Sequence, residues 1–286
     1  MEKAIKKADV LIEALPYIKS YSGKIFVIKY GGSALINPEI KKGVLQDIVF
    51  MSYVGIRPII VHGGGPFIND EFRRLGRKVE FSDGLRVTTK EEVEIVDSVL
   101  SRVNANIVSD IKALGGRAVS MNTSKKNVII AMPHKESKRL GFVGEINKVN
   151  AEAIRNAVRP RAISVISPVS MGDDKELYNI NADDAASEIA MAVKAVKLVL
   201  LTDVKGIMRH KGEESTLIST LGMKDADTLI ERKVIQSGMI PKVKACMNAL
   251  KAGVSKTHII DGRIPHSLLL EIFTDKGIGT EIVKDR

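Results

Sequence analysis

Apolar and polar residues follow two periodicities along this chain, one typical of strands and one typical of helices. Short uninterrupted apolar runs, such as residues 198–201, are typical of strands buried on both faces of a parallel sheet. Strands are predicted at 25–30, 57–62, 117–121, 127–132, 161–167, 197–203 and 257–261. Helices are predicted between and after them, at 38–54, 66–75, 90–114, 151–157, 182–194, 225–234, 241–252 and 265–273. This alternation predicts an α/β fold, a three-layer α/β/α sandwich with a mainly parallel central sheet.

Two regions depart from the simple alternation. Several short strands crowd residues 117–149, which predicts a β-rich excursion. Residues 3–18 precede the first strand and predict an amphipathic helix that Pro16 kinks or ends. Four apolar residues share one face of this helix: Ile5, Ala8, Ile12 and Leu15. That face needs a surface to bury against, either another subunit or its own domain.

Two glycine runs each follow a predicted strand. Lys29-Tyr-Gly-Gly-Ser follows the first strand, and His62-Gly-Gly-Gly-Pro follows the second. A strand that runs into glycines and then into a helix exposes backbone N–H groups to an anion. Either run alone is also an ordinary strand-to-helix turn. Together, and with a lysine in one of them, they indicate a phosphoryl-transfer site without a Walker A sequence.

Three further segments could complete such a site. Lys242 follows Gly238-Met-Ile-Pro at a helix start, a second setting that favours anions, although a single lysine is usually just solvated. Asn179-Ile-Asn-Ala-Asp183 opens a helix with more polar groups than a cap needs, and its carboxylate could orient the two lysines. Thr202-Asp203-Val-Lys205-Gly206 follows the most apolar strand, where ligands of parallel sheets bind.

Composition narrows the function classes. The 286 residues are 44% hydrophobic and 27% charged, as in a globular protein, and no apolar run reaches the roughly 18 residues of a membrane span. The start of the chain lacks an apolar signal core, so we expect a cytoplasmic protein without membrane contact. Of the net charge of +10, a surplus of six lies between Ser124 and Arg161. With 4% aromatic residues and no nucleic-acid motif, this surplus favours a field that attracts anionic substrates over nucleic-acid binding.

The single cysteine excludes an intramolecular disulfide. Cys246 shares a helical stripe with Val243, Met247 and Leu250, which predicts a core residue and not a reactive thiol. No cluster of cysteine and histidine has the spacing of a zinc site.

Taken in chain order, the motifs resemble the N-acetyl-L-glutamate kinase family, within the amino-acid kinases, over essentially the whole chain. The segments that carry the resemblance are Lys29-Tyr-Gly-Gly, His62-Gly-Gly-Gly-Pro, Asp83-Gly-Leu-Arg86-Val-Thr, Gly141-Phe-Val-Gly-Glu145, Asn179-Ile-Asn-Ala-Asp183, Leu200-Leu-Thr-Asp203 and Gly238-Met-Ile-Pro-Lys242-Val. The N-terminal helix and the segment from His266 to Thr280 are similar to those of the arginine-sensitive, hexameric branch.

The resemblance implies ATP-dependent phosphorylation of the side-chain carboxylate of N-acetyl-L-glutamate, with Mg²⁺ arriving on ATP. It assigns catalysis to Lys29, Lys242 and Asp183. It assigns substrate binding to Gly31, Gly32, Gly64, Gly65, Arg86 and Asn179, and the nucleotide site to Thr202, Asp203, Lys205 and Gly206. A carboxylate nucleophile is already ionised at neutral pH and needs no general base, so we expect His62 to be structural.

The resemblance also implies domains and regulation. Residues 1–20 would be an oligomerisation helix, and residues 24–286 a kinase domain with an acetylglutamate lobe at 24–176 and an ATP lobe at 177–286. The assembly would be a hexamer, a trimer of dimers, inhibited by L-arginine at Tyr17, Glu271 and Gly277.

Alternatives and departures accompany this hypothesis. A kinase for N-acetyl-aminoadipate differs by one methylene, which discriminates by only about 1–3 kcal/mol. The Arg86 motif disfavours a carbamate or nucleoside-monophosphate kinase, and the two lysines disfavour a non-catalytic arginine or nucleotide sensor. Ser237, Asp184 and residues 121–127 depart from the family pattern, which bears on local loop conformation.

Overall fold

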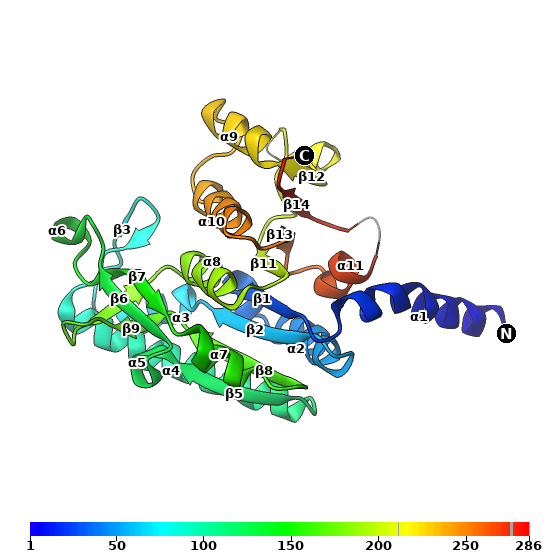
Figure 1. Cartoon of the computed structure of the whole chain (residues 1–286). Coiled ribbons are helices and arrows are strands. Elements are labelled where there is room, and N and C mark those ends of the chain that lie inside the picture. Colours follow the sequence, from blue (N-terminus) through cyan, green and yellow to red (C-terminus); the bar gives the residue numbers. More distant parts are fainter. Residues whose placement is uncertain (211, 275–276, 286) are drawn as a thin grey trace.

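A large sheet forms the centre of the molecule. The computed structural model describes residues 1–210, 212–274 and 277–285. Among these residues, eight strands form the sheet (Figure 1). Their order is β12 (Thr220–Gly222), β14 (Thr280–Val283), β13 (Lys256–Asp261), β11 (Lys197–Thr202), β1 (Ile25–Tyr30), β2 (Arg57–His62), β8 (Ala162–Ser167) and β5 (Arg117–Asn122). The strands from β13 to β5 are parallel, and β14 is antiparallel to β13. The predicted, mainly parallel sheet is therefore confirmed.

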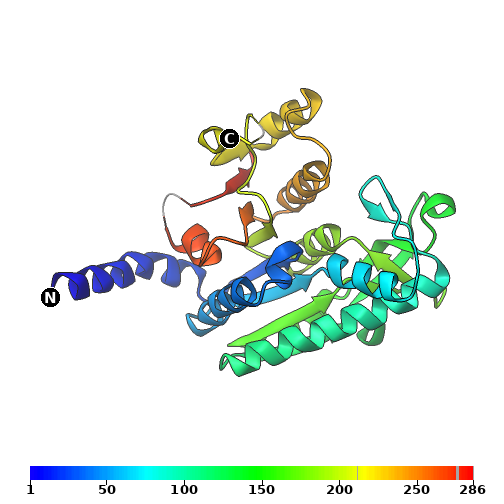
Figure 2. The same ribbon diagram turned by 180° about the vertical axis from the view of Figure 1, so that it is seen from behind.

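Helices cover both faces of this sheet. Successive residues of a strand point to opposite sides, so each strand contributes side chains to two cores. Phe26 and Ile28 of β1 pack in one core with α2 (Pro38–Tyr53), α4 (Lys90–Ala113) and α11 (Ser267–Phe273). Val27 packs in the other core with α7 (Ala151–Ala157), α8 (Ala182–Val193) and α10 (Met239–Lys251). Figure 2 shows the long α4 lying along one face of the sheet. The three-layer sandwich is confirmed.

A smaller sheet forms the predicted β-rich excursion. Its strand order is β6 (Ile129–Pro133), β7 (Val143–Val149), β10 (Leu177–Ile180) and β9 (Val169–Met171). It therefore extends well beyond residue 149, whereas the first part of the expected 117–149 forms β5 of the main sheet, which corrects that prediction. Beside it stands the hairpin of β3 (Phe81–Ser82) and β4 (Leu85–Arg86), next to α6 (Ser137–Leu140) in both ribbon views. These strands have two to seven residues, and the shortest ones carry no apolar run from which they could be predicted.

Local capping explains why the main helices begin where the sequence predicts. The Asn37 side chain accepts from the N–H groups of Glu39 and Ile40 at the start of α2. Thr89 and Glu92 form both hydrogen bonds of a capping box at the start of α4. The remaining helical elements are α3 (Gly65–Arg74), α5 (Thr123–Lys126), α9 (Met223–Glu231) and the 3-10 turns η1 (Gly32–Leu35) and η2 (Glu214–Thr216).

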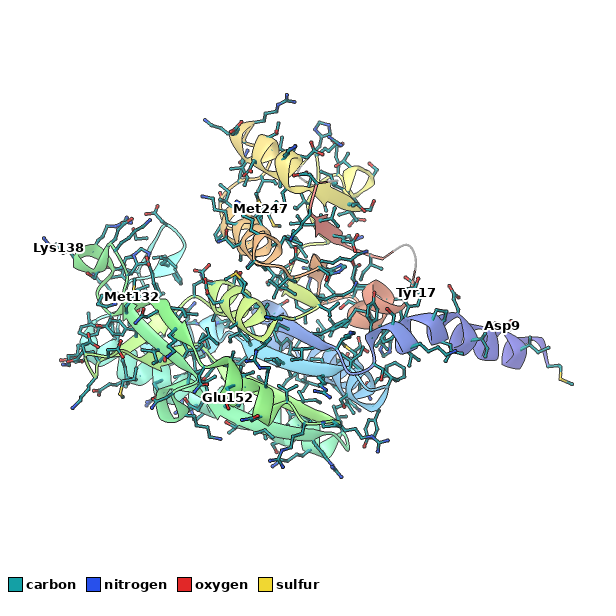
Figure 3. The ribbon with its side chains drawn as sticks, viewed as in Figure 1. Asp9, Tyr17, Met132, Lys138, Glu152 and Met247 are labelled. Carbon is teal, nitrogen blue, oxygen red and sulfur yellow. The ribbon has the colours of Figure 1, made fainter. Side chains whose placement is uncertain are left out.

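The N-terminal helix α1 (Glu2–Tyr21) projects from the body of the protein (Figure 1). It continues past Pro16 to Tyr21, so the prediction that it could end at Pro16 is wrong. Its last turns, including Ile18 and Tyr21, pack on the core that contains α11. Figure 3 labels Tyr17 near α11 and Asp9 on the projecting part. Ile5, Ile12 and Leu15 are 54%, 68% and 41% exposed, whereas the side chain of Ala8 lies outside the described residues.

Cys246 lies on α10 and is completely buried, which confirms the prediction of a core residue. Burial raises the pKa of its thiol to about 12. We therefore expect a thiol reagent at pH 8 to leave the native protein unmodified and to label one site per chain in denaturant. Rapid labelling of the native protein in a mass-spectrometric assay would contradict this prediction.

No helix in the described part of the chain is long and apolar enough to cross a membrane.

Candidate active site

A pocket of about 340 Å³ opens beside the carboxyl ends of β1 and β2, between the main sheet and the smaller sheet. Both predicted glycine runs reach it, together with the β3–β4 hairpin and the start of α8. Of the predicted site residues, Lys29, Gly31, Gly32, Gly64, Gly65, Arg86, Asn179 and Asp183 line this one pocket. The structure therefore brings together residues that lie more than 150 positions apart in the chain.

A carboxylate between two lysines stands at the pocket wall. The Lys29 Nζ lies 3.1 Å from one oxygen of Asp183, and the Lys242 Nζ lies 2.5 Å from the other. Burial alone would raise the pKa of Asp183, but the two ammonium groups outweigh burial and lower the pKa, so the carboxylate is ionised at neutral pH. The site then holds two positive charges and one negative charge, a net positive charge suited to a phosphoryl group.

The packing of α8 and α10 brings Lys242 to this carboxylate. Asn181 caps α8 by accepting from the backbone N–H groups of Asp183 and Asp184, which places Asp183 in the first turn. Lys242 comes from the first turn of α10, whose N-cap is Gly238. Ser237, just before it, has φ +46°, a left-handed conformation that favours glycine.

The glycine run after β2 lies against α4. The Gly63 N–H donates to the Tyr30 carbonyl at 2.8 Å, which ties the run to the end of β1. A side chain at Gly64 would meet the end of the Leu100 side chain of α4, which would have to shift to admit it. Pro66 then stands in the first turn of α3, where a missing N–H costs little.

Arg86 of β4 is buried, and neighbouring side chains hold its guanidinium in place. Its Nη2 donates to Asn69 Oδ1 at 2.5 Å, and its guanidinium lies over the rings of Phe72 and Phe81 at 5.4 and 4.8 Å from their centroids. Its Nη1 is buried and finds no hydrogen-bond partner among the described residues. An unpaired buried donor on a fixed guanidinium is suited to a carboxylate ligand. Sequence reasoning missed Asn69, because no local pattern marks it.

Asn179 of β10 lies near the base of the same hairpin. Its Nδ2 donates to Thr88 Oγ1 at 3.3 Å, while its backbone N–H donates to the Phe142 carbonyl. The side-chain amide is thus oriented by the segment that follows Arg86, and it borders the pocket.

The residues predicted to bind the nucleotide lie outside this pocket, at the carboxyl end of β11. Asp203 accepts from the Ser33 backbone N–H at 3.1 Å and from its hydroxyl at 2.7 Å, which joins this loop to the turn after β1. Gly32 has φ +67°, and a side chain there would meet the Asp203 carboxylate. Lys205 pairs with Glu214, and Gly206 packs against Thr280.

Glu271 and Gly277, two of the residues predicted to bind L-arginine, lie together near the base of α1. Glu271 is buried and accepts from His258 Nδ1 at 2.7 Å and from the backbone N–H groups of Ile278 and Gly279. Burial alone would raise its pKa, but these hydrogen bonds outweigh burial and lower it. Gly277 has φ +57° and approaches the Glu271 carboxylate closely.

Two buried side chains that sequence reasoning missed extend this cluster toward α1. Lys197 Nζ lies 3.0 Å from His258 Nε2 and 5.3 Å from the centroid of the Tyr21 ring, and Tyr21 contacts Tyr17. Burial lowers the pKa of Lys197 to about 8. A polar residue inside an apolar strand run was the available signal for both His258 and Lys197.

Comparison with known proteins agrees with this arrangement. A model of the amino acid kinase family matches residues 24–261. Acetylglutamate kinases of Desulforamulus reducens and Heliobacterium modesticaldum are each 50% identical to this chain, covering 100% and 99% of it and 100% of their own lengths. A crystal structure of N-acetylglutamate synthase from Neisseria gonorrhoeae, complexed with coenzyme A and N-acetyl-glutamate, aligns with a TM-score of 0.87 at 28% identity. That alignment covers 98% of this chain and 64% of the synthase.

The parallel sheet, the pocket beside the ion pairs of Asp183 with Lys29 and Lys242, and the similarity along the whole length of the chain all point to the same family. The chain belongs to the amino acid kinase family.

Proposed function

We propose that this chain transfers the γ-phosphoryl group of ATP to the side-chain carboxylate of N-acetyl-L-glutamate, in arginine biosynthesis. The observation that carries the proposal is the Asp183 carboxylate between Lys29 and Lys242, beside a pocket that contains the buried guanidinium of Arg86. The relatives that are 50% identical over their whole length support it.

The reaction needs positioning and charge more than covalent help from the protein. A side-chain carboxylate oxygen of the substrate forms a bond to the γ-phosphorus, and the bond from that phosphorus to the leaving oxygen of ADP breaks. The products are an acyl phosphate and ADP, and no proton has to be removed from the nucleophile. Lys29 and Lys242 neutralise the transferring group, and Asp183 holds both ammonium groups.

ATP enters as its Mg²⁺ complex. Among the described residues, no three histidine, cysteine, aspartate or glutamate side chains gather as a metal site. We propose that phosphate oxygens and water supply most of the ligands of this ion, as is usual for Mg²⁺. The lysines of this chain then complete the neutralisation of the phosphates.

The two substrates occupy different lobes in this proposal. Residues 24–176 contribute the glycine runs and Arg86 for acetylglutamate, with backbone N–H groups of Gly31, Gly32, Gly64 and Gly65 facing its side chain and the phosphates. Residues 177–286 contribute the loop of Thr202, Asp203, Lys205 and Gly206 for ATP. Asn179 and Asp183 come from this second part and reach into the acetylglutamate pocket.

An assay of acyl phosphate formation tests this function against its alternatives. ATP-dependent hydroxamate formation is compared for N-acetyl-L-glutamate, N-acetyl-aminoadipate and unacetylated glutamate. We expect the first substrate to have the highest kcat/KM. A preference for the longer acid identifies the aminoadipate kinase, and no turnover with any of the three identifies a non-catalytic sensor.

Arg86→Lys tests the carboxylate site separately from catalysis. Lysine keeps the charge but loses the planar fork that binds a carboxylate through two hydrogen bonds. We expect KM for N-acetyl-L-glutamate to rise by about tenfold or more, the scale of a charge-assisted hydrogen bond, while KM for ATP stays nearly unchanged. A selective rise in KM for ATP would place Arg86 in the nucleotide site instead.

We further propose that L-arginine inhibits the enzyme by binding between α1 and α11, at Tyr17, Glu271 and Gly277. Supporting this, the acidic Glu271 and the tyrosines of α1 are linked through His258 and Lys197. Glu271 would have to exchange an internal hydrogen bond for the guanidinium. Such an exchange couples arginine to the arrangement of the surrounding elements, because a ligand shifts a conformational equilibrium only through differential affinity.

The exposed apolar face of α1 supports a hexamer, a trimer of dimers, in which this helix packs on its copy in another dimer.

We propose that the enzyme works in the cytoplasm, where it has access to ATP.

A further inference from the structure

His62 is the last residue of β2 and stands directly before the glycines that line the pocket, yet the reaction above assigns it no chemistry. Its side chain is completely buried. The Nδ1 atom lies 2.9 Å from the carbonyl oxygen of Gly63, and the Nε2 atom lies 3.1 Å from Asn104 Nδ2 of α4. Both ring nitrogens are therefore engaged, one with the glycine run and one with a helix.

The neighbours of Asn104 determine which ring nitrogen carries the proton. Asn104 Nδ2 also lies 3.1 Å from the Val165 carbonyl, which can only accept, so this atom is the amide donor. Ser120 Oγ donates to Asn104 Oδ1 at 2.6 Å, which agrees with that orientation. The Nε2 atom of His62 therefore accepts from Asn104, and Nδ1 carries the proton and donates to Gly63. Burial lowers the pKa of His62 to about 4, so the ring is neutral with this single donor at physiological pH.

This hydrogen bond orients a backbone donor of the pocket. The Gly63 carbonyl and the Gly64 N–H belong to one trans peptide unit, in which the two bonds point in opposite directions. Because the carbonyl faces the buried ring of His62, the Gly64 N–H faces away from that ring. All three glycines of the run line the pocket. Within the described residues, this N–H has no backbone acceptor. The peptide before it is held by the bond from Gly63 N–H to Tyr30.

We propose that His62 is a positioning residue, whose Nδ1–H holds the Gly63–Gly64 peptide so that the Gly64 N–H points at the oxygens of the reacting carboxylate and phosphoryl group. The proposal rests on the phosphoryl transfer proposed above. Asn104 supports it by fixing the tautomer, and Leu100 of the same helix packs against Gly64. A preorganised donor of this kind acts on charge that develops in the transition state, so its loss lowers kcat more than substrate binding.

Substitution of His62 by asparagine or by glutamine distinguishes the roles of the two ring nitrogens. The Nδ2 of His62→Asn lies close to the position of Nδ1 and can still donate to Gly63. The amide of His62→Gln reaches toward the position of Nε2 and can contact Asn104, but it leaves the Gly63 carbonyl without its donor. We expect His62→Gln to lower kcat at least about tenfold, and both KM values to change by less than about threefold. We expect His62→Asn to keep kcat within about threefold of the wild type.

Thermal unfolding of both variants provides the control, because both lose the packing of the ring. A merely structural role predicts that kcat follows stability, with the smaller asparagine at least as damaging as glutamine. Equal kcat losses in the two variants, or full activity of His62→Gln, would overturn the proposal.

A second measurement does not depend on activity. NMR of the wild-type protein with ¹⁵N-labelled histidine should show the Nδ1–H tautomer for the resonance that disappears in His62→Asn. An Nε2–H tautomer would overturn the proposal even if both variants lose activity. A wild-type enzyme that makes no acyl phosphate from N-acetyl-L-glutamate would instead refute the proposed function and leave the tautomer result standing.

Discussion

Replacing Lys29 or Lys242 with alanine should lower kcat for acyl phosphate formation by about 100-fold or more, the scale of losing one preorganised contact in a transition state. Each variant removes one of the two ammonium groups that flank Asp183. The remaining lysine and the buried carboxylate then neutralise each other, and little positive charge is left for the transferring phosphoryl group. Steady-state kinetics with N-acetyl-L-glutamate and ATP measure the effect.

Lys41→Ala is the matched control for these variants. Lys41 also pairs with an aspartate, Asp110, but on the outer surface of α2 and α4, away from the pocket. We expect this variant to keep kcat within about twofold, because this partly exposed ion pair contributes little and lies outside the pocket that Lys29 and Asp183 line. If Lys29→Ala or Lys242→Ala behaves like the control, the catalytic role assigned to that lysine is wrong.

Deleting residues 1–20 should convert an arginine-inhibited hexamer into an active dimer that arginine does not inhibit. The deletion removes the exposed apolar side chains of Ile5, Ile12 and Leu15, which have no partner surface within the described part of their own chain. It also removes Tyr17, one of the residues proposed to contact arginine. Light scattering measures the assembly, and activity with increasing L-arginine measures the inhibition.

Single substitutions on α1 test the role of its apolar face in assembly without removing the whole segment. Ile12→Glu places a charge on the apolar face and should also give dimers, whereas Glu13→Gln, next to it in the chain and exposed, should keep the hexamer. A full-length protein that is already a dimer, or a truncated protein that stays hexameric and arginine-sensitive, would refute the proposed role of α1.

The sequence alone predicted the main strands and helices, because these depend on local features. Apolar runs mark β1 and β11, and caps such as Asn37 and Thr89 mark helix starts within a few neighbouring residues. The glycine runs could likewise be recognised in the sequence, because each directly follows a predicted buried strand. The two-residue strands β3 and β4 were not, because such short elements form only where the rest of the fold supports them.

Only the tertiary structure decided how the candidate residues meet. Lys29 and Lys242 share one carboxylate because α8, which carries Asp183, packs against both β1 and α10. The roles of Asn69 beside Arg86 and of Asn104 behind His62 likewise depend on contacts between distant segments. Periodicity and capping act over a few residues of chain, whereas a binding pocket is built from side chains that strand register and helix packing bring together.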